Sequence, residues 1–60
     1  MEAWERDLDW LRDHFGYADE NEQDAFCEKV ACLVYEGMAE ITAREQALGM
    51  IRDQRKERHQ

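Results

Sequence analysis

Two cysteines and two histidines are the side chains of this chain best suited to bind a metal ion or attack a substrate. Cys27 and Cys32 are five positions apart, which on a helix turns their sulfur atoms about 140° from each other. The thiols then cannot share a metal ion, and their Cα atoms lie too far apart for an unstrained disulfide. Zinc sites also prefer closer cysteines with two further ligands. We therefore interpret both as buried or half-buried structural thiols, and predict no metal ion and no cofactor.

Catalytic groups are scarce in the rest of the sequence. Serine is absent, and Thr42 is expected to cap a helix. A pair formed by a cysteine and His14 would lack a third group to orient the imidazole. A chain of 60 residues also has little material with which to enclose a pocket of roughly 300 Å³. We predict that the protein is not an enzyme.

The charge of the chain is strongly negative and unevenly distributed. Residues 1–51 carry 13 acidic and 4 basic residues, whereas basic residues outnumber acidic ones in the segment 52–60. DNA binding needs Lys and Arg against the phosphates, so the net charge of −7 disfavours direct contact with nucleic acid. It favours a protein partner with a basic surface.

Four acidic residues of the N-terminal segment fall on one side of a helix. Placed at 100° per residue, they span only about 80° of the helix surface. These residues, which we name the acidic strip, are Glu2, Glu5, Asp9 and Asp13. A solvated face that keeps a small protein soluble would have the same pattern. The alternative is a partner-binding strip that imitates a phosphate backbone and occupies a nucleic-acid-binding cleft.

Two aromatic residues lie away from the main apolar positions. Trp10 falls about 130° from the centre of the first apolar stripe, where either another helix covers it or it anchors a partner. Tyr35 lies off the main apolar arc of its helix in the same way. We expect Trp10 to join the acidic strip in partner binding, and both aromatic residues to be candidates for a dimer interface.

The elements that carry these residues are predicted from apolar spacing and helix-forming composition. We expect an all-α, compact three-helix bundle with helices at about residues 2–15, 20–36 and 42–57, the first two ended by Gly16 and Gly37. The expected core positions are Trp4, Leu8, Leu11 and Phe15, then Phe26, Val30 and Leu33 flanked by Cys27, Val34 and Met38, and finally Ala43, Ala47, Met50 and Ile51.

Two capping boxes support these helix starts. Asp19 with Glu22, and Thr42 with Glu45, have the spacing in which a side chain and a backbone N–H satisfy each other. Residues 1–60 are expected to form one domain, with a basic tail at 52–60 that is exposed or frayed. The absence of an apolar signal segment or a long apolar run predicts a protein with no membrane association, in a reducing cytoplasmic setting.

The acidic, helical, small chain without catalytic groups resembles the inhibitor proteins of phages and mobile elements, among them the anti-CRISPR proteins. The resemblance implies inhibition by occlusion of a basic, nucleic-acid-binding surface of a host complex. One alternative is a homodimeric regulatory or assembly module. Another is a helix-turn-helix DNA-binding regulator, with Ala43, Arg44 and Gln46 at the start of its recognition helix.

Overall fold

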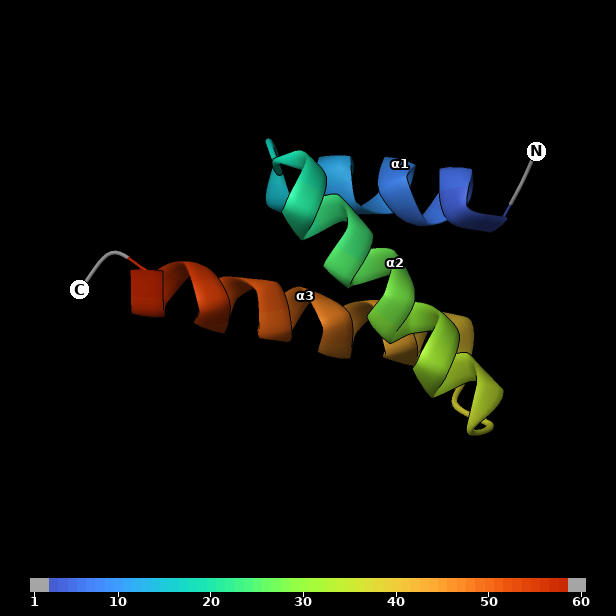
Figure 1. Cartoon of the computed structure of the whole chain (residues 1–60). Helices are drawn as coiled ribbons and strands as arrows, with labels where there is room; N and C mark the ends of the chain where they lie inside the picture. The colour runs from blue at the N-terminus through green and yellow to red at the C-terminus, as the bar shows by residue number, and fades with distance from the viewer. Residues whose placement is uncertain (1–2, 59–60) are drawn as a thin grey trace.

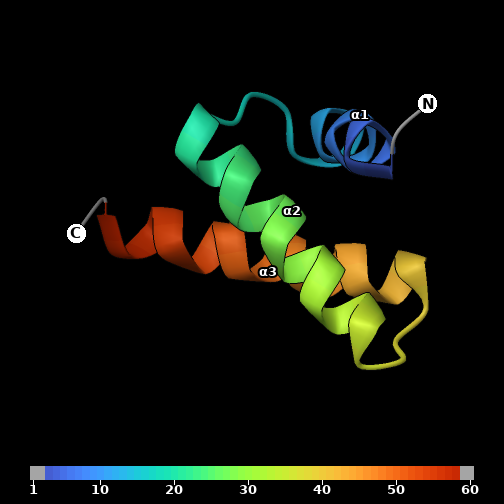
Figure 2. The same cartoon turned by 45° about the vertical axis from the view of Figure 1, so that its right-hand side comes forward.

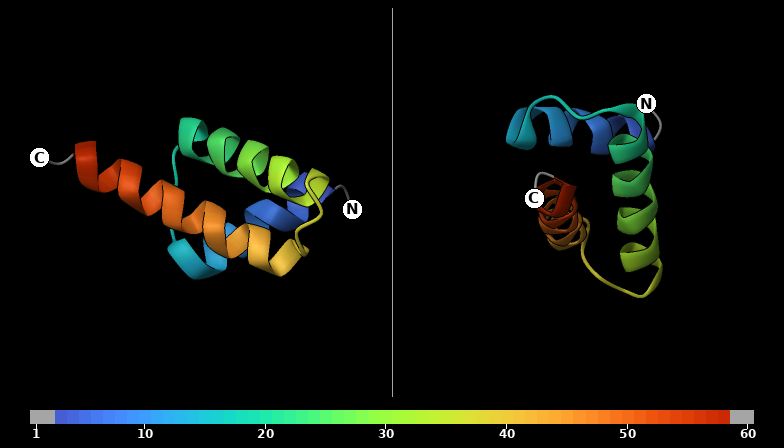
Figure 3. Two further views of the ribbon diagram at one scale, coloured as in Figure 1. Left: turned by 90° about the horizontal axis from the view of Figure 1, so that it is seen from below. Right: turned by 60° about the vertical axis from the view of Figure 1, so that its left-hand side comes forward.

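The computed structural model describes residues 3–58 and confirms the all-α bundle. Its helices are α1 (Ala3–Phe15), α2 (Glu20–Tyr35) and α3 (Glu40–Arg58). Helix α2 crosses α3 at an angle, and a short turn joins them (Figures 1 and 2). When α3 is viewed nearly end-on, α1 and α2 lie along two sides of it (Figure 3). The core therefore lies where the three helices face one another.

The core is small and built around three large side chains. Leu11, Phe26 and Ile51, one from each helix, are almost fully buried. The smaller residues Val30, Leu33, Ala43 and Ala47 are buried as predicted, and Ala18 and Leu48 join the core without having been predicted.

Other predicted core positions are less buried. Leu8, Phe15, Cys27, Met38 and Met50 are half-buried, and Val34 is exposed. The side chain of Trp4 lies outside the described residues. Because alanine is small, the two buried alanines bring α3 close to its neighbours.

Glycines end the first two helices, as predicted. Gly16 and Gly37 adopt φ values of +90° and +105°, a region that favours glycine. At the end of α2, the Met38 N–H donates to the Leu33 carbonyl at 3.0 Å, and the Gly37 N–H donates to the Val34 carbonyl at 2.9 Å. This pairing is a Schellman motif, and it turns the chain sharply toward α3.

One of the two predicted capping boxes is confirmed, and the other was wrong. The Glu22 N–H donates to Asp19 Oδ1 at 2.8 Å, and the Asp19 N–H donates to Glu22 Oε1 at 3.0 Å. Helix α3, however, begins at Glu40, and its first turn closes on the Ala39 carbonyl. Thr42 therefore lies inside the first turn. An acidic residue at the N-terminus of a helix stabilises this earlier start.

The basic tail is helical up to Arg58. Arg52, Lys56 and Arg58 are exposed, as expected, whereas Arg55 is half-buried against other elements. Within residues 3–58, no helix combines the length and apolar character needed to cross a membrane.

Candidate interaction surface

The acidic strip lies mostly on α1, and we call it the α1 acidic strip from here on. It is exposed along most of its described length. Asp9 and Asp13 are exposed, and Glu5 is half-buried. Glu2 lies outside the described residues. At 100° per residue, Arg6 falls about 20° beyond Asp13 on one edge, and Arg12 falls about 20° before Glu5 on the other. The two arginines therefore border the strip and partly offset its charge.

A fourth acid of α1 points into the molecule instead. Asp7 is buried, with 8% of its surface exposed, and its Oδ1 accepts a hydrogen bond from Arg44 Nε at 2.8 Å. Arg44 also contacts Glu40 Oε2 at 3.4 Å. This ion-pair cluster of Asp7, Arg44 and Glu40 holds α1 against the first turns of α3. Asp7 therefore stabilises the packing of α1 on α3 and is not part of the exposed acidic surface.

The same cluster bears on the helix-turn-helix alternative. Ala43 is fully buried, and Arg44 has a side chain that is only 16% exposed. Gln46 is exposed. Base reading requires side chains that project into a groove, but of the three expected contact positions Ala43 is buried and Arg44 is mostly buried.

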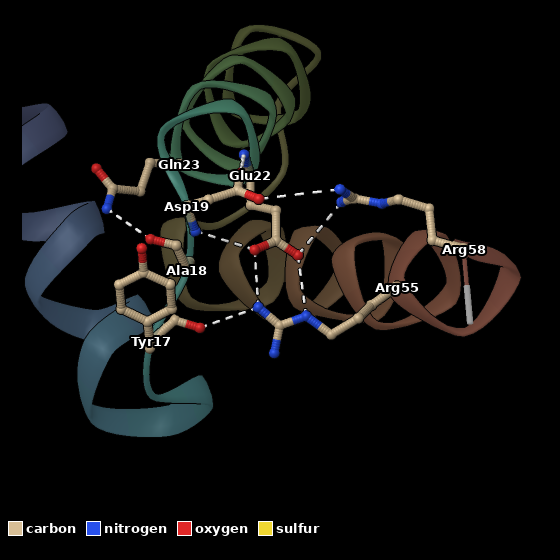
Figure 4. Close-up of polar contacts among 7 residues, drawn as sticks. All are labelled: Tyr17, Ala18, Asp19, Glu22, Gln23, Arg55 and Arg58. Carbon is tan, nitrogen blue, oxygen red and sulfur yellow. Dashed lines mark hydrogen bonds and ion pairs between the residues drawn. The ribbon is translucent and has the colours of Figure 1, made fainter.

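Glu22 is the centre of a second ion-pair cluster, formed with Asp19, Arg55 and Arg58 (Figure 4). Arg55 donates from Nη2 to Oε1 at 2.7 Å and from Nε to Oε2 at 3.0 Å, a bidentate pair. Arg55 Nη2 also donates to the Tyr17 carbonyl at 2.9 Å. The Glu22 cluster therefore joins the α1–α2 connection, the start of α2 and the end of α3.

Arg55 also lies over an aromatic ring. Its guanidinium carbon is 4.4 Å from the centroid of the Phe15 ring, within range of a cation–π contact. This contact adds the end of α1 to the elements that Arg55 holds together. Arg55, which was predicted to lie in an exposed tail, therefore helps to hold the helices together.

The hydrogen bonds from Arg55, against the opposing effect of burial, lower the pKa of Glu22 below its ordinary value of 4.5. A lowered folded-state pKa contributes stability above the unfolded pKa, and this contribution is lost as the pH falls through the folded pKa. We therefore expect the thermal midpoint to fall more between about pH 7 and about pH 3 in the wild type than in Glu22→Gln, where this carboxyl is absent. Circular dichroism measures both midpoints. Equal losses in the two proteins would contradict the assignment.

A second row of exposed carboxylates follows α2. Glu20, Asp24 and Glu28 are all exposed and stand four residues apart, a step of about 6 Å along the helix. We name these three residues the α2 acidic row. This row was not among the predicted site residues, although its regular four-residue spacing is visible in the sequence.

The two aromatic candidates have different surroundings. Trp10 is half-buried, and its ring is stacked with Phe26 at a centroid distance of 6.0 Å and with His14 at 4.1 Å. His14 Nδ1 donates to the Trp10 carbonyl at 2.9 Å. Trp10 therefore packs at the margin of the core, whereas Tyr35 is 93% exposed. A role for either residue in partner binding remains a prediction.

The cysteines offer no built reactive site. Cys27 is half-buried, as predicted, but Cys32 is exposed, because it lies on the side of α2 that faces away from the core. Burial, together with the charges of Asp7 and Asp24, raises the pKa of the Cys27 thiol, which keeps it neutral. Among the described residues, no three side chains form a metal-binding group, and no buried side-chain polar atom lacks a partner.

Comparison with protein-family models found no matching family, and searches of curated proteins and of solved structures found no match.

Proposed function

We propose that this protein binds a protein partner through its exposed carboxylates and inhibits that partner by covering a basic, nucleic-acid-binding surface. The observation that carries the proposal is the imbalance of surface charge that remains after the internal ion pairs are formed. The three arginines of the two ion-pair clusters are already paired with acids of those clusters, so they do not neutralise the remaining acids.

Within residues 5–58, acids without an ion pair outnumber bases without an ion pair two to one. Ten acids form no ion pair with another described residue, and all are exposed except the half-buried Glu5. These acids are Glu5, Asp9, Asp13, Glu20, Asp24, Glu28, Glu36, Glu45, Asp53 and Glu57. Five bases are likewise outside any such pair, namely Arg6, Arg12, Lys29, Arg52 and Lys56. A surface of this kind attracts a basic partner and repels nucleic acid.

The arrangement of the carboxylates supports occlusion as the mechanism. The α1 acidic strip and the α2 acidic row each place charges at helical steps of about 4–6 Å on rigid helices. Such preorganised rows lose little entropy on binding. Lys and Arg side chains that normally contact phosphates would then contact carboxylates, and the nucleic acid would be excluded.

Three exposed acid pairs of identical i, i+4 spacing allow a matched test: Asp9 with Asp13 on α1, Asp24 with Glu28 on α2, and Asp53 with Glu57 on α3. Reversal to lysine changes the net charge equally in each double variant. In a tagged pull-down from bacterial lysate with stepwise salt elution, we expect Asp9→Lys/Asp13→Lys to lose the captured protein. The α3 variant should keep it, because basic residues already surround that pair.

Several outcomes would contradict the proposal. Equal capture by the α1 and α3 variants would show that the α1 acidic strip does not bind the partner. Capture that resists high salt would show that the contact is not electrostatic, since exposed ion pairs are screened by salt. Circular dichroism of each variant confirms that the helices are intact.

A homodimeric module is the second candidate, and exposed apolar side chains at the α2–α3 turn favour it. Val34, Tyr35 and Ile41 are 38%, 93% and 50% exposed. In a two-fold dimer such a patch would be buried against its own copy. Sedimentation equilibrium separates the candidates: a monomeric mass at all concentrations rejects the dimer.

A further inference from the structure

An apolar groove runs beside the C-terminal half of α2, on the side away from the Glu22 cluster. Cys27, Ala31, Val34 and Tyr35 line it from α2, and the ion-pair cluster of Asp7, Arg44 and Glu40 lines it from α1 and α3. Its volume is about 490 Å³ and its lining is mostly apolar. The groove has room for one or two large side chains of a partner.

The lining is chemically inert and firmly held. The Cys27 thiol is neutral, for the reason given above, and therefore behaves as a small apolar group. Asp7 and Arg44 neutralise each other at 2.8 Å, so no unpaired charge from them faces the groove. An apolar side chain can enter without leaving a buried charge uncompensated.

The groove shares Ala31 and Tyr35 with the side of α2 that carries the α2 acidic row, and its residues Cys27 and Val34 lie about 60–80° to one side of that line. At 100° per residue, Asp24, Ala31 and Tyr35 fall within about 40° of one another, and Glu20 and Glu28 lie within about 60° of this line. The N-terminal half of this face is thus acidic and its C-terminal half is apolar. From Glu20 to Tyr35 it is roughly 22 Å long.

We propose that this face of α2 binds an amphipathic, basic helical segment of a protein partner. Apolar side chains of the segment enter the groove beside Val34 and Tyr35, and its Lys or Arg side chains meet the α2 acidic row. A helix of about 15 residues spans the face. The inference rests on the proposed function. Beyond the α1 acidic strip, it adds a second contact surface on α2 and the chemistry of the segment that binds there.

Charge distinguishes this occupant from a second copy of the chain. A second copy would bring its own α2 acidic row to the face, adding three carboxylates to the three already there. Like charges brought together at an interface oppose association. An amphipathic basic segment avoids this repulsion, because its Lys or Arg side chains meet the α2 acidic row while its apolar side chains fill the groove.

The test uses two dye-labelled helical peptides of about 15 residues, the length that matches the face. One places lysines and leucines on opposite faces, and the other has alanine at every leucine position. Fluorescence anisotropy at low salt measures their binding to the whole protein. We expect the leucine peptide to bind at least about tenfold more tightly, because only it can fill the groove.

Matched variants locate the contact. Tyr35→Ala should weaken binding of the leucine peptide about tenfold, whereas Tyr17→Ala, which removes a tyrosine that is 83% exposed elsewhere, should change it less than about twofold. Asp24→Lys/Glu28→Lys should weaken binding by more than about tenfold, and Asp53→Lys/Glu57→Lys by less than about threefold. All these side chains are exposed, so the fold is retained.

The failures of the two proposals are distinguishable. Asp9→Lys/Asp13→Lys is measured beside these variants. If Tyr35→Ala and Tyr17→Ala act equally, or if only Asp9→Lys/Asp13→Lys weakens binding, the groove is not the site, while acidic binding of a basic partner still stands. If neither peptide binds in a salt-dependent way, both proposals fail. If the peptides do not bind and Tyr35→Ala converts a dimer to a monomer, a second copy occupies the face and the inference is overturned.

Discussion

Phe26→Ala is expected to leave the chain largely unfolded. Phe26 is fully buried and is one of the three largest such side chains in the core. Truncation of a buried phenylalanine costs about 3–5 kcal/mol. A chain of 60 residues has a total stability of roughly 3–9 kcal/mol, so the variant loses at least about a third of it and, toward the lower end of this range, all of it.

The conservative variant Phe26→Leu provides the control, because it keeps most of the volume and should cost about 1–1.5 kcal/mol. Far-UV circular dichroism during urea unfolding measures both. The expected order is wild type, Phe26→Leu and then Phe26→Ala, with the last showing little cooperative transition. A transition for Phe26→Ala close to that of the wild type would show that Phe26 does not hold the three helices together.

Glu22→Ala is expected to have the second largest effect on stability. The side chain is 3% exposed, caps α2 and accepts the bidentate pair from Arg55. Loss of a cap costs about 1 kcal/mol, and loss of one partner from a buried pair costs about 3–5 kcal/mol. Because the Arg55 side chain is 37% exposed and regains water, we expect a total of about 3 kcal/mol. The thermal midpoint should fall by more than about 10 °C.

Two further variants separate the contributions at this position. Glu22→Gln keeps a side-chain oxygen that can cap α2 but removes the charge and one of the two oxygens that accept from Arg55, so it should lose about half as much. Asp24→Ala removes an exposed acid of the same helix and should change stability by less than about 0.5 kcal/mol. If Glu22→Ala unfolded at the same temperature as Asp24→Ala, the Glu22 cluster would have no part in holding α3 to α2.

Most of the fold could be predicted from the sequence because its signals are local. Gly16, Gly37 and the Asp19–Glu22 capping box act within a few residues, and the spacing of Phe26, Val30 and Leu33 marks a buried face. The start of α3 was missed because Thr42 resembled a cap while Glu40 gave no comparable signal. Contacts between distant segments, such as Arg55 with Glu22, leave no periodic pattern in the sequence.

The candidate surface was predictable only in part, for the same reason. The sequence shows how many acids a segment carries, but not which of them are paired inside. Asp7 looked like its neighbours on α1, and only the packing of α1 on α3 places it against Arg44. The α2 acidic row, in contrast, could have been found from its four-residue spacing. The groove beside it could not, because it is formed jointly by three helices.

The central claim is that the acidic surface displaces nucleic acid from a basic protein. The most direct test takes the protein captured in the pull-down, binds it to a labelled oligonucleotide, and follows fluorescence anisotropy as the chain is added. We predict that the wild type and Asp53→Lys/Glu57→Lys displace the oligonucleotide, and that Asp9→Lys/Asp13→Lys does not. If the oligonucleotide stays bound while the chain also binds the same protein, occlusion is contradicted.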